Sequence, residues 1–268
     1  MKRVSKGAVP EALQNYMDSN PEATWEEMSD DNMYGGGQAA HDCRNQAIHD
    51  QKGLCAYCEQ KISSDDPIHR RIEHFHPKSD KIGTHNWSLD WNNMLATCDG
   101  GSSSLQQERV IHPLPGNLSC DAHKDRMVQT GRLQEDCEGY LLNPLAIPAF
   151  PNLFKLDKGT GHLISDESSC AVVDVDGNTF GTTQELVLNT IDMLNINCNR
   201  LAERRRLIVI DVERNKKRLR QRGYTYAEAP GKLIDRYFNT RWPEFFTTLR
   251  CCLGSAAEDY LKSINYQG

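Results

Sequence analysis

Two kinds of potential metal ligand lie within one short stretch of the sequence, CAYCEQKISSDDPIHRRIEHFHPK, which runs from Cys55 to Lys78. Cys55 and Cys58 form a C-x2-C pair, and paired thiolates favour a closed, tetrahedral zinc site. Glu73 and His74 combine a carboxylate with an imidazole, and such a set favours a harder cation with positions open to a substrate. The stretch by itself is compatible with one metal ion, two or none. The number of metal sites therefore depends on further ligands elsewhere in the sequence.

Two later cysteines, Cys98 and Cys120, could complete the thiolate site. Four thiolates close the tetrahedral shell of zinc, so two cysteine pairs are a much stronger signal than one. Here 21 residues separate the members of the second pair, but the entropy of closing a loop grows only slowly with its length. Asp121 and His123 could each replace a cysteine ligand. We expect a structural zinc ion bound by all four cysteines.

The other polar residues of this segment suit the hydrolysis of a phosphodiester. That reaction needs a base for the attacking water, a cation that stabilises negative charge, and a group that orients the base. His74 suits the role of the base near neutral pH. Glu73 and a second histidine, His123, suit a single cation with open positions. The amide of Asn93, or that of Asn92, could fix the loop that carries the base.

A strand, a loop and a helix must position these residues. The run RRIEHF predicts a strand that ends before Pro77. NLSCDAHKDRMVQTG predicts a helix that begins near Ser119 and ends at Gly131. The segment 51–131 has little apolar content, so we expect it to need a metal ion to fold.

The positions of Glu73 and His74 impose a geometric condition on any shared site. Neighbouring side chains of a strand point to opposite faces. The two residues can therefore serve one site only at the end of a strand or at a bend. Pro77, which follows closely, favours such an end.

The flanking regions are predicted to be mainly helical. Residues 1–50 combine helical segments with an acidic stretch, and residues 132–268 form a mainly helical C-terminal region. Within the latter, AVVDVDGNTFG predicts a hairpin around Asp176 and Gly177, and residues 183–222 read as one helical stretch. The predicted fold class is α+β, mostly helical, with the segment 51–131 as a central domain between two helical regions.

The second half of that stretch, residues 200–222, is strongly basic. Ten Arg and Lys residues against three acids give a local charge of +7. Apolar residues at helical spacing leave the basic face outside. An ordinary solvated face and a surface that binds phosphates, including Arg204, Arg205 and Arg206, remain equally good interpretations.

The composition limits the possible functions of the whole chain. The 268 residues carry a net charge of -6, whereas a protein that binds nucleic acid alone is usually basic. Any nucleic-acid contact must therefore be local or shared with a partner. The N-terminal residues lack the apolar run of a signal peptide, and no stretch is long enough to span a bilayer. We expect a soluble cytoplasmic protein whose ten cysteines are thiols or metal ligands.

The order of these motifs resembles that of the HNH nuclease family. A C-x2-C pair is followed by Glu-His before a proline, by an asparagine before an apolar residue, by two more cysteines and by a histidine on the closing helix. The segments CAYCE, IEHFHPKS, LDWNNMLATC and CDAHK are most similar to PtuB, the HNH component of the Septu anti-phage systems, which also occurs in some retron operons. WEEM and YLLNPL outside this segment resemble the same group.

The resemblance implies a ββα-metal fold with a four-cysteine zinc site and a role for each matched residue. It implies that His74 is the general base, that Glu73 and His123 bind a catalytic Mg2+ or Mn2+, and that Asn93 is the middle asparagine. In many relatives a histidine directly follows the last cysteine, whereas here Asp121 does, so Asp121 is the other candidate for the last ligand. Lys78, Lys124 and the three arginines at 204–206 are predicted to contact nucleic acid.

The predicted function is a metal-dependent endonuclease that cleaves DNA. The resemblance implies an effector of an anti-phage complex held inactive by a PtuA-like ATPase. One alternative is a non-enzymatic zinc module that binds nucleic acid or protein, and another is an RNase. A zinc module has no use for Glu73, His74 and His123 together, so their joint presence favours the enzyme.

Overall fold

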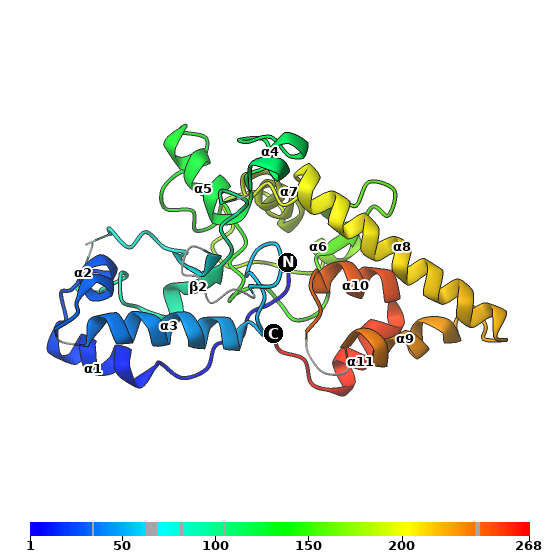
Figure 1. Ribbon diagram of the computed structural model, residues 1–268, viewed down its shortest axis with the longest axis horizontal. Helices are drawn as coiled ribbons and strands as arrows, with labels where there is room; N and C mark the ends of the chain where they lie inside the picture. Colours follow the sequence, from blue (N-terminus) through cyan, green and yellow to red (C-terminus); the bar gives the residue numbers. More distant parts are fainter. Residues whose placement is uncertain (34, 63–68, 81–82, 104, 239–241) are drawn as a thin grey trace.

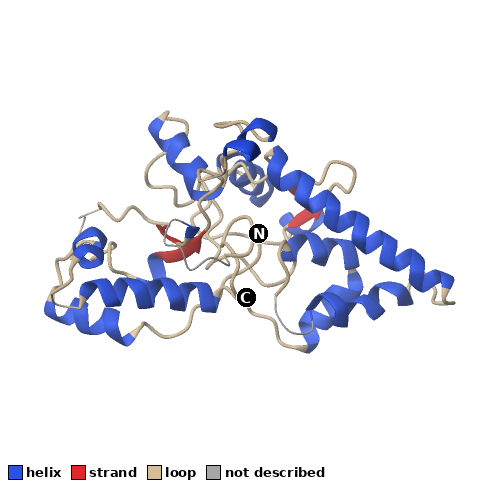
Figure 2. Ribbon diagram, viewed as in Figure 1, coloured by secondary structure: helices blue, strands red, loops and turns tan. Residues whose placement is uncertain are grey.

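The computed structural model describes residues 1–33, 35–62, 69–80, 83–103, 105–238 and 242–268. The described chain is a mixed protein of helices and two small antiparallel sheets of two strands each. Figure 2 shows helices at both ends of the molecule and loops and short strands in its centre. The mixed, largely helical class expected from the sequence is confirmed at this level.

The N-terminal region contains α1 (Glu11–Ser19), α2 (Trp25–Asp30) and α3 (Gly36–Asp50). The helix α2 begins with a capping box, in which Thr24 Oγ1 accepts from the backbone N–H of Glu27 and the Glu27 carboxylate accepts from the N–H of Thr24. These helices lie together at one end of the molecule (Figure 1). The acidic residues between Asp18 and Asp31 lie mostly on α1 and α2 and only partly in loops. The helix α2 packs against α3.

The central region holds a two-stranded sheet and the helix that follows it. Strand β1 (Arg71–His74) pairs with β2 (Met94–Thr97), with Glu73 opposite Leu95 and His74 opposite Met94. A short 3-10 helix, η2 (Trp91–Asn93), leads into β2. After β2 come α4 (Gln106–Ile111) and α5 (Cys120–Gln129). The predicted strand and the predicted helix are confirmed, and α5 ends before a glycine at 131 with φ +70°.

The C-terminal region differs from the sequence prediction in two places. The predicted helical stretch 183–222 is two helices, α7 (Thr183–Met193) and α8 (Asn199–Gln221), because the chain turns at Asn195, where φ is +44°. The hairpin predicted around Asp176 is wrong, since residues 171–181 form turns. A hairpin forms earlier, where β3 (Phe154–Leu156) pairs with β4 (Leu163–Ser165).

The remaining helices close the C-terminal end. They are α6 (Glu167–Cys170), α9 (Glu228–Phe238), α10 (Phe246–Leu253) and α11 (Ser255–Ser263). One apolar core joins the N-terminal helices, the central sheet and α7, and a second joins α8 to α11. Figure 1 shows α8 extending from the centre of the molecule to its far end. Among the described residues, no helix combines the length and apolar character needed to cross a membrane.

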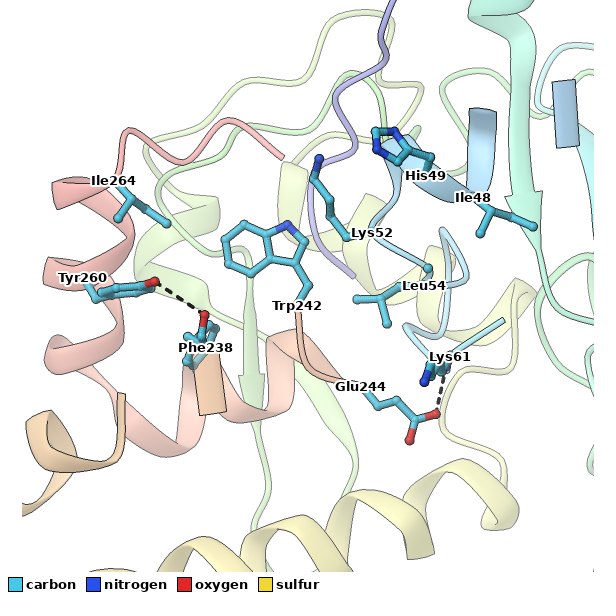
Figure 3. A pocket seen from close by; sticks show the side chains of 11 residues that line it. Ile48, His49, Lys52, Leu54, Lys61, Phe238, Trp242, Glu244, Tyr260 and Ile264 are labelled. Carbon is cyan, nitrogen blue, oxygen red and sulfur yellow. Dashed lines mark hydrogen bonds between the residues drawn. The ribbon is translucent and has the colours of Figure 1, made fainter. Parts of the chain in front are cut away.

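A cavity of about 640 Å³ lies between α3 and the C-terminal helices. Its aromatic and apolar wall includes Leu54, Phe238, Trp242 and Tyr260, as Figure 3 shows. None of the residues that the sequence marks as ligands, base or phosphate contacts lines it. The candidate chemistry is therefore elsewhere, in the central region.

Candidate catalytic and metal-binding site

The thiols of four cysteines meet inside the central region. The Sγ–Sγ distance is 3.8 Å for Cys55–Cys120 and for Cys98–Cys120, and 3.7 Å for Cys58–Cys98. Sulfurs placed about 2.3 Å from the centre of a tetrahedron lie about 3.8 Å apart. All ten cysteines are free thiols. The four thiols therefore have the spacing of ligands around one tetrahedral metal ion, and zinc fits this donor set.

A tight turn presents the first two thiols. The N–H of Cys55 donates to the carbonyl of Gln60 at 2.8 Å, and the N–H of Glu59 donates to the carbonyl of Cys55 at 3.0 Å. The turn closes because Glu59 adopts the left-handed conformation, with φ +64°. The four thiols also form hydrogen bonds with one another. Burial alone would raise the pKa of Cys55, but contacts with the other three thiols lower it well below its ordinary value.

A glycine contact explains how Cys98 and Cys120 come together despite their separation in sequence. Gly100 has φ +64°, and a Cβ there would lie 2.2 Å from the carbonyl oxygen of Ser119. The N–H of Ser119 donates to the carbonyl of Gly100 at 3.0 Å. Only glycine permits this approach, so the intervening loop is closed at its base.

Two arginines of α8 lie beside the thiol cluster. Arg200 donates to Gln60 Oε1 at 2.7 Å and to Ser119 Oγ at 2.9 Å. Burial lowers the pKa of Arg200, but nearby cysteine sulfurs outweigh it and raise the pKa above its ordinary value. Arg205 is 1% exposed and donates to the carbonyl of Ile196 at 2.7 Å. Four thiolates around a divalent cation leave a charge of about -2, which these guanidinium groups offset.

This position corrects the prediction for Arg205, which cannot contact nucleic acid from inside the core. Successive residues of a helix are about 100° apart, so Arg204 and Arg206 are exposed on either side of it. Arg204 is paired with Glu244 at 3.4 Å. The two exposed arginines remain available to a ligand or a partner.

A second cavity, of about 320 Å³, lies between the end of β1 and one face of α5. Glu73 and His74 line it from the strand, and Asp121, Lys124 and Asp125 line it from the helix. His74 is the last residue of β1. The requirement that Glu73 and His74 meet at a strand end is therefore fulfilled.

Glu73 is buried at the centre of a polar cluster. It forms an ion pair with Lys124, and Tyr57 donates to its Oε1 at 3.3 Å. Burial on its own raises the pKa of Glu73, but the charge of Lys124 and the hydrogen bond from Asp121 lower it below its ordinary value. Burial, together with the charge of Glu73, raises the pKa of Asp121 well above its ordinary value. The surroundings therefore favour the ionised form of Glu73 and the protonated form of Asp121.

This carboxyl pair suits a divalent cation. Two buried carboxyl groups in hydrogen-bond contact repel each other when both are ionised. A hard cation that takes oxygen ligands would relieve that repulsion in place of the proton. Glu73 and Asp121 thus fit the two protein ligands of a Mg2+ or Mn2+ ion with open positions.

The structure places Asp121, and not His123, beside Glu73. Residues 121, 124 and 125 share one face of α5, whereas residue 123 lies about 200° around the helix from residue 121. The Nδ1 atom of His123 lies 2.9 Å from the carbonyl of Met193 instead. His123 does not line the cavity. The prediction that His123 joins Glu73 is therefore wrong in this structure, and the other candidate, Asp121, occupies the position.

His74 is buried and held in one orientation. Its Nε2 lies 2.9 Å from the carbonyl of Ser88, which can only accept, so Nε2 carries the proton and Nδ1 the lone pair. The indole of Trp25 packs edge-on against the ring at 5.5 Å, and the backbone N–H of Trp25 donates to Ser88 Oγ at 2.7 Å. Burial lowers the pKa of His74 to about 4. The imidazole is therefore neutral and able to accept a proton at neutral pH.

Asn93 fixes the loop between β1 and β2. Its Oδ1 accepts from the N–H of His76 at 2.7 Å, and its Nδ2 donates to the carbonyls of His76 and Trp87, each at 3.0 Å. Asn93 is 4% exposed, whereas Asn92 is exposed. The asparagine thus holds the chain that follows His74 and is not placed to contact a substrate.

The two lysines predicted to contact nucleic acid differ in exposure. Lys78 is exposed at the rim of the cavity, where it pairs with Glu26 of α2. Lys124 is 6% exposed and occupied by Glu73. Lys78 is therefore the better placed of the two to meet a phosphate.

The sequence analysis missed two contributors to the site. Tyr57 lies between Cys55 and Cys58 in the sequence, and its hydroxyl donates to Glu73. It therefore links the thiol cluster to the cavity beside Glu73. Trp25 comes from a region treated as a separate flank. The capping-box pattern from Thr24 to Glu27 signals the helix that carries Trp25, but no local pattern signals its contact with His74.

No protein-family model matches the chain. A search of curated proteins finds one from Escherichia coli named "Retron Ec83 putative HNH endonuclease". The two chains are 33% identical over 257 residues, which cover 93% of this chain and 92% of that protein. The similarity therefore extends over the helical flanks as well as the central region.

Proposed function

Because this chain belongs to the HNH endonuclease family, we propose that β1, β2 and α5 form its ββα-metal unit and that it cleaves DNA. The chain is an HNH-type endonuclease. One observation carries the assignment of the site. Glu73, His74 and Asp121 line one cavity between β1 and α5, and the Nε2 atom of His74 is held by the carbonyl of Ser88.

In the proposed mechanism His74 is the general base. Its Nδ1 lone pair takes the proton of the attacking water, and the carbonyl of Ser88 stabilises the imidazolium that results. Glu73 and Asp121 would hold a Mg2+ or Mn2+ ion, which when bound would supply charge stabilisation to the reacting phosphate. Lys124 holds Glu73 in place. Asn93 positions the loop after the base and does not touch the reacting atoms.

The four cysteines have a structural role in this proposal. They would hold a zinc ion with no position open to substrate, because all four positions of the tetrahedron would be protein thiolates. Cys120 would then fix the N-terminus of α5 to the turn that begins at Cys55 and carries Tyr57. Glu73 and Asp121 are thus positioned by the zinc site without contacting it.

The proposed biological setting is a defence complex. The similar protein is named for a retron, which supports an effector role in an anti-phage system with a PtuA-like ATPase partner. The charge of -6 on the whole chain supports a partner that supplies part of the DNA affinity. Lys78, Arg204 and Arg206 are the exposed cations that we propose for phosphate or partner contacts.

The test is cleavage by the full chain co-expressed and purified with its genomic neighbour. Supercoiled plasmid and a folded RNA are incubated with Mg2+, with Mn2+ and with EDTA. The proposal predicts cleavage of the plasmid that depends on the metal ion and is lost in His74→Ala. Cleavage of RNA alone would replace the DNA assignment, and metal-independent cleavage would contradict the mechanism.

A further inference from the structure

A third group of potential ligands lies outside both centres described above. His76, Asp136 and Glu138 each place one ligand atom within 4.8 Å of the others. His76 follows β1, and the two acids lie in the segment after α5. None of these residues lines the catalytic cavity or touches the four thiols. The proposed mechanism does not use them.

One ring nitrogen of His76, Nδ1, makes no hydrogen bond to the described residues. His76 is 8% exposed, and its Nδ1 is buried without a hydrogen-bond partner among the described residues. This Nδ1 lies 3.3 Å from the Glu138 carboxylate, but the geometry is not that of a hydrogen bond. A buried polar atom without a partner is rare in folded proteins, and here it points to a missing ligand.

The other side of the ring is occupied in the way that metal-binding histidines require. The Nε2 of His76 lies 2.9 Å from Asp80 Oδ2. A carboxylate that accepts from one ring nitrogen leaves the lone pair on the other nitrogen and makes it a better ligand. The indole of Trp87 stacks on the same ring at 3.9 Å. The ring is therefore held with Nδ1 facing the two acids.

The backbone on both sides of the group is also fixed. The amide of Asn93 binds both the N–H and the carbonyl of His76. Between the two acids, the Cys137 thiol donates to the carbonyl of Phe75 at 3.2 Å, and this side chain is buried. The carboxylates themselves are exposed. A rigid imidazole thus faces two adjustable carboxylates on an anchored segment.

We propose that His76, Asp136 and Glu138 bind a third divalent cation, of the Mn2+ or Zn2+ type. An imidazole suits zinc, and two carboxylates with water suit manganese, so the mixed set fits these two ions best. Ligand atoms about 2.1 Å from one ion lie within about 4.2 Å of one another. A small movement of the exposed carboxylates achieves that spacing. The ion would tie the loop after His74 to the segment after α5.

The experiment is a Mn2+ titration of the purified full chain, followed by the electron paramagnetic resonance signal of the free ion. The wild-type chain is compared with Asp136→Asn/Glu138→Gln, which removes the two exposed ligands of the proposed site. A second variant, Glu73→Gln/Asp121→Asn, removes the catalytic ligands, and Glu22→Gln is a control at an exposed acid elsewhere. The melting temperature of each metal-free variant checks its fold.

We expect Asp136→Asn/Glu138→Gln to lose one Mn2+ equivalent that Glu73→Gln/Asp121→Asn retains. Asp80→Ala should weaken the same equivalent by about 10- to 100-fold, because it removes the carboxylate that orients the imidazole. Bound Mn2+ should raise the melting temperature of Glu73→Gln/Asp121→Asn and not that of a variant with all four substitutions.

The inference is wrong if Asp136→Asn/Glu138→Gln binds as many Mn2+ ions, with the same affinities, as the wild-type chain. It is also wrong if Glu73→Gln/Asp121→Asn binds no Mn2+ and a parallel calorimetric titration with Zn2+ finds no site beyond the four cysteines. In either case His76 is an ion-pair partner of Asp80 and Glu138 only. Neither result bears on the proposed nuclease function, which depends on different residues.

Discussion

The thiol cluster and the cleft between β1 and α5 are neighbours on one helix, since α5 contributes Cys120 to the first and Asp121 to the second, but they differ in how their ligand atoms are arranged. At the cluster, four like ligands already have tetrahedral spacing, and three of the four are buried. At the cleft between β1 and α5, the carboxyl groups of Glu73 and Asp121 lie next to Lys124 and the imidazole of His74, and all four side chains line a cavity of about 320 Å³. The first is a closed site and the second an open one.

The comparison shows that the central region keeps its stabilising thiol site apart from the polar groups that could react with a substrate. A closed four-thiolate site contributes to folding and offers no position to a substrate. The open site gives two carboxyl groups different acidities. Burial raises the pKa of Glu73, but the charge of Lys124 and the contact with Asp121 lower it below its ordinary value, whereas burial and the charge of Glu73 raise the pKa of Asp121. Substitutions at the thiol cluster should therefore unfold the protein, whereas substitutions at the open site should reduce cleavage and leave the fold intact.

The largest expected effect is at the closed site. Cys58→Ser should release the metal ion and unfold the central region, because structural zinc contributes about 10–16 kcal/mol in small zinc-binding peptides. Circular dichroism and the zinc content of the purified protein measure this. Cys170→Ser is the matched control, since it also buries a hydroxyl but lies outside the cluster. It should cost only about 1–3 kcal/mol. Equal losses in both variants would contradict the distinction.

The next effect is at the open site and should spare the fold. His74→Ala should reduce the cleavage rate by about 10²–10⁴-fold, because it removes the general base. Zinc content should stay at the wild-type level. His49→Ala, at an imidazole that is 76% exposed, serves as the control and should cleave normally. A His74→Ala variant with near-normal cleavage would remove the base from the mechanism.

A smaller effect distinguishes the buried ion pair from an exposed one. Lys124→Met should destabilise the metal-free protein by about 3–5 kcal/mol, because it leaves Glu73 charged and unpaired in the interior. Mn2+ should restore part of that stability by taking the place of the ammonium group. Lys78→Met breaks the exposed pair with Glu26 and should cost about 0–1 kcal/mol. Urea denaturation with and without Mn2+ provides the comparison, and no rescue of Lys124→Met would argue against a cation at Glu73.

The smallest effect on stability is expected on α8. Arg204→Glu/Arg206→Glu should change the free energy of unfolding by about 0.5 kcal/mol or less, while it weakens DNA or partner binding. The salt dependence of DNA binding should also decrease, by about one ion for each phosphate that the two side chains no longer neutralise. Arg205→Glu should instead unfold the protein, because it buries an acid beside the thiols. If Arg204→Glu/Arg206→Glu binds DNA and partner as the wild type does, that face is only solvated.

The sequence predicts the closed site better than the open one. The four cysteines could be grouped from the sequence because two cysteine pairs complete the tetrahedral shell of zinc. The final ligand of the open site could not be assigned from spacing alone. It depends on which face of α5 meets β1, and the spacing of residues along the chain does not fix that face.

Burial was the other property that the sequence could not supply. Arg204, Arg205 and Arg206 look alike in a basic run, but the middle residue is buried because it lies beside the thiols and under the loop at Ile196. Similarly, Trp25 reaches His74 only because α2 folds over the loop that follows the base. Trp25 and Ser88 are 63 positions apart in the sequence, and no local pattern records a contact between them.

The most direct test of the central claim is the cleavage rate as a function of Mn2+ concentration for three variants. Asp121→Asn should cleave slowly and recover partly as Mn2+ increases, because it has lost a ligand of the cation. His74→Ala should stay slow at every concentration, and His123→Ala should follow the wild-type curve, because its imidazole bonds to Met193. The opposite pattern, with His123→Ala inactive and rescued by Mn2+ while Asp121→Asn cleaves normally, would contradict the site described here.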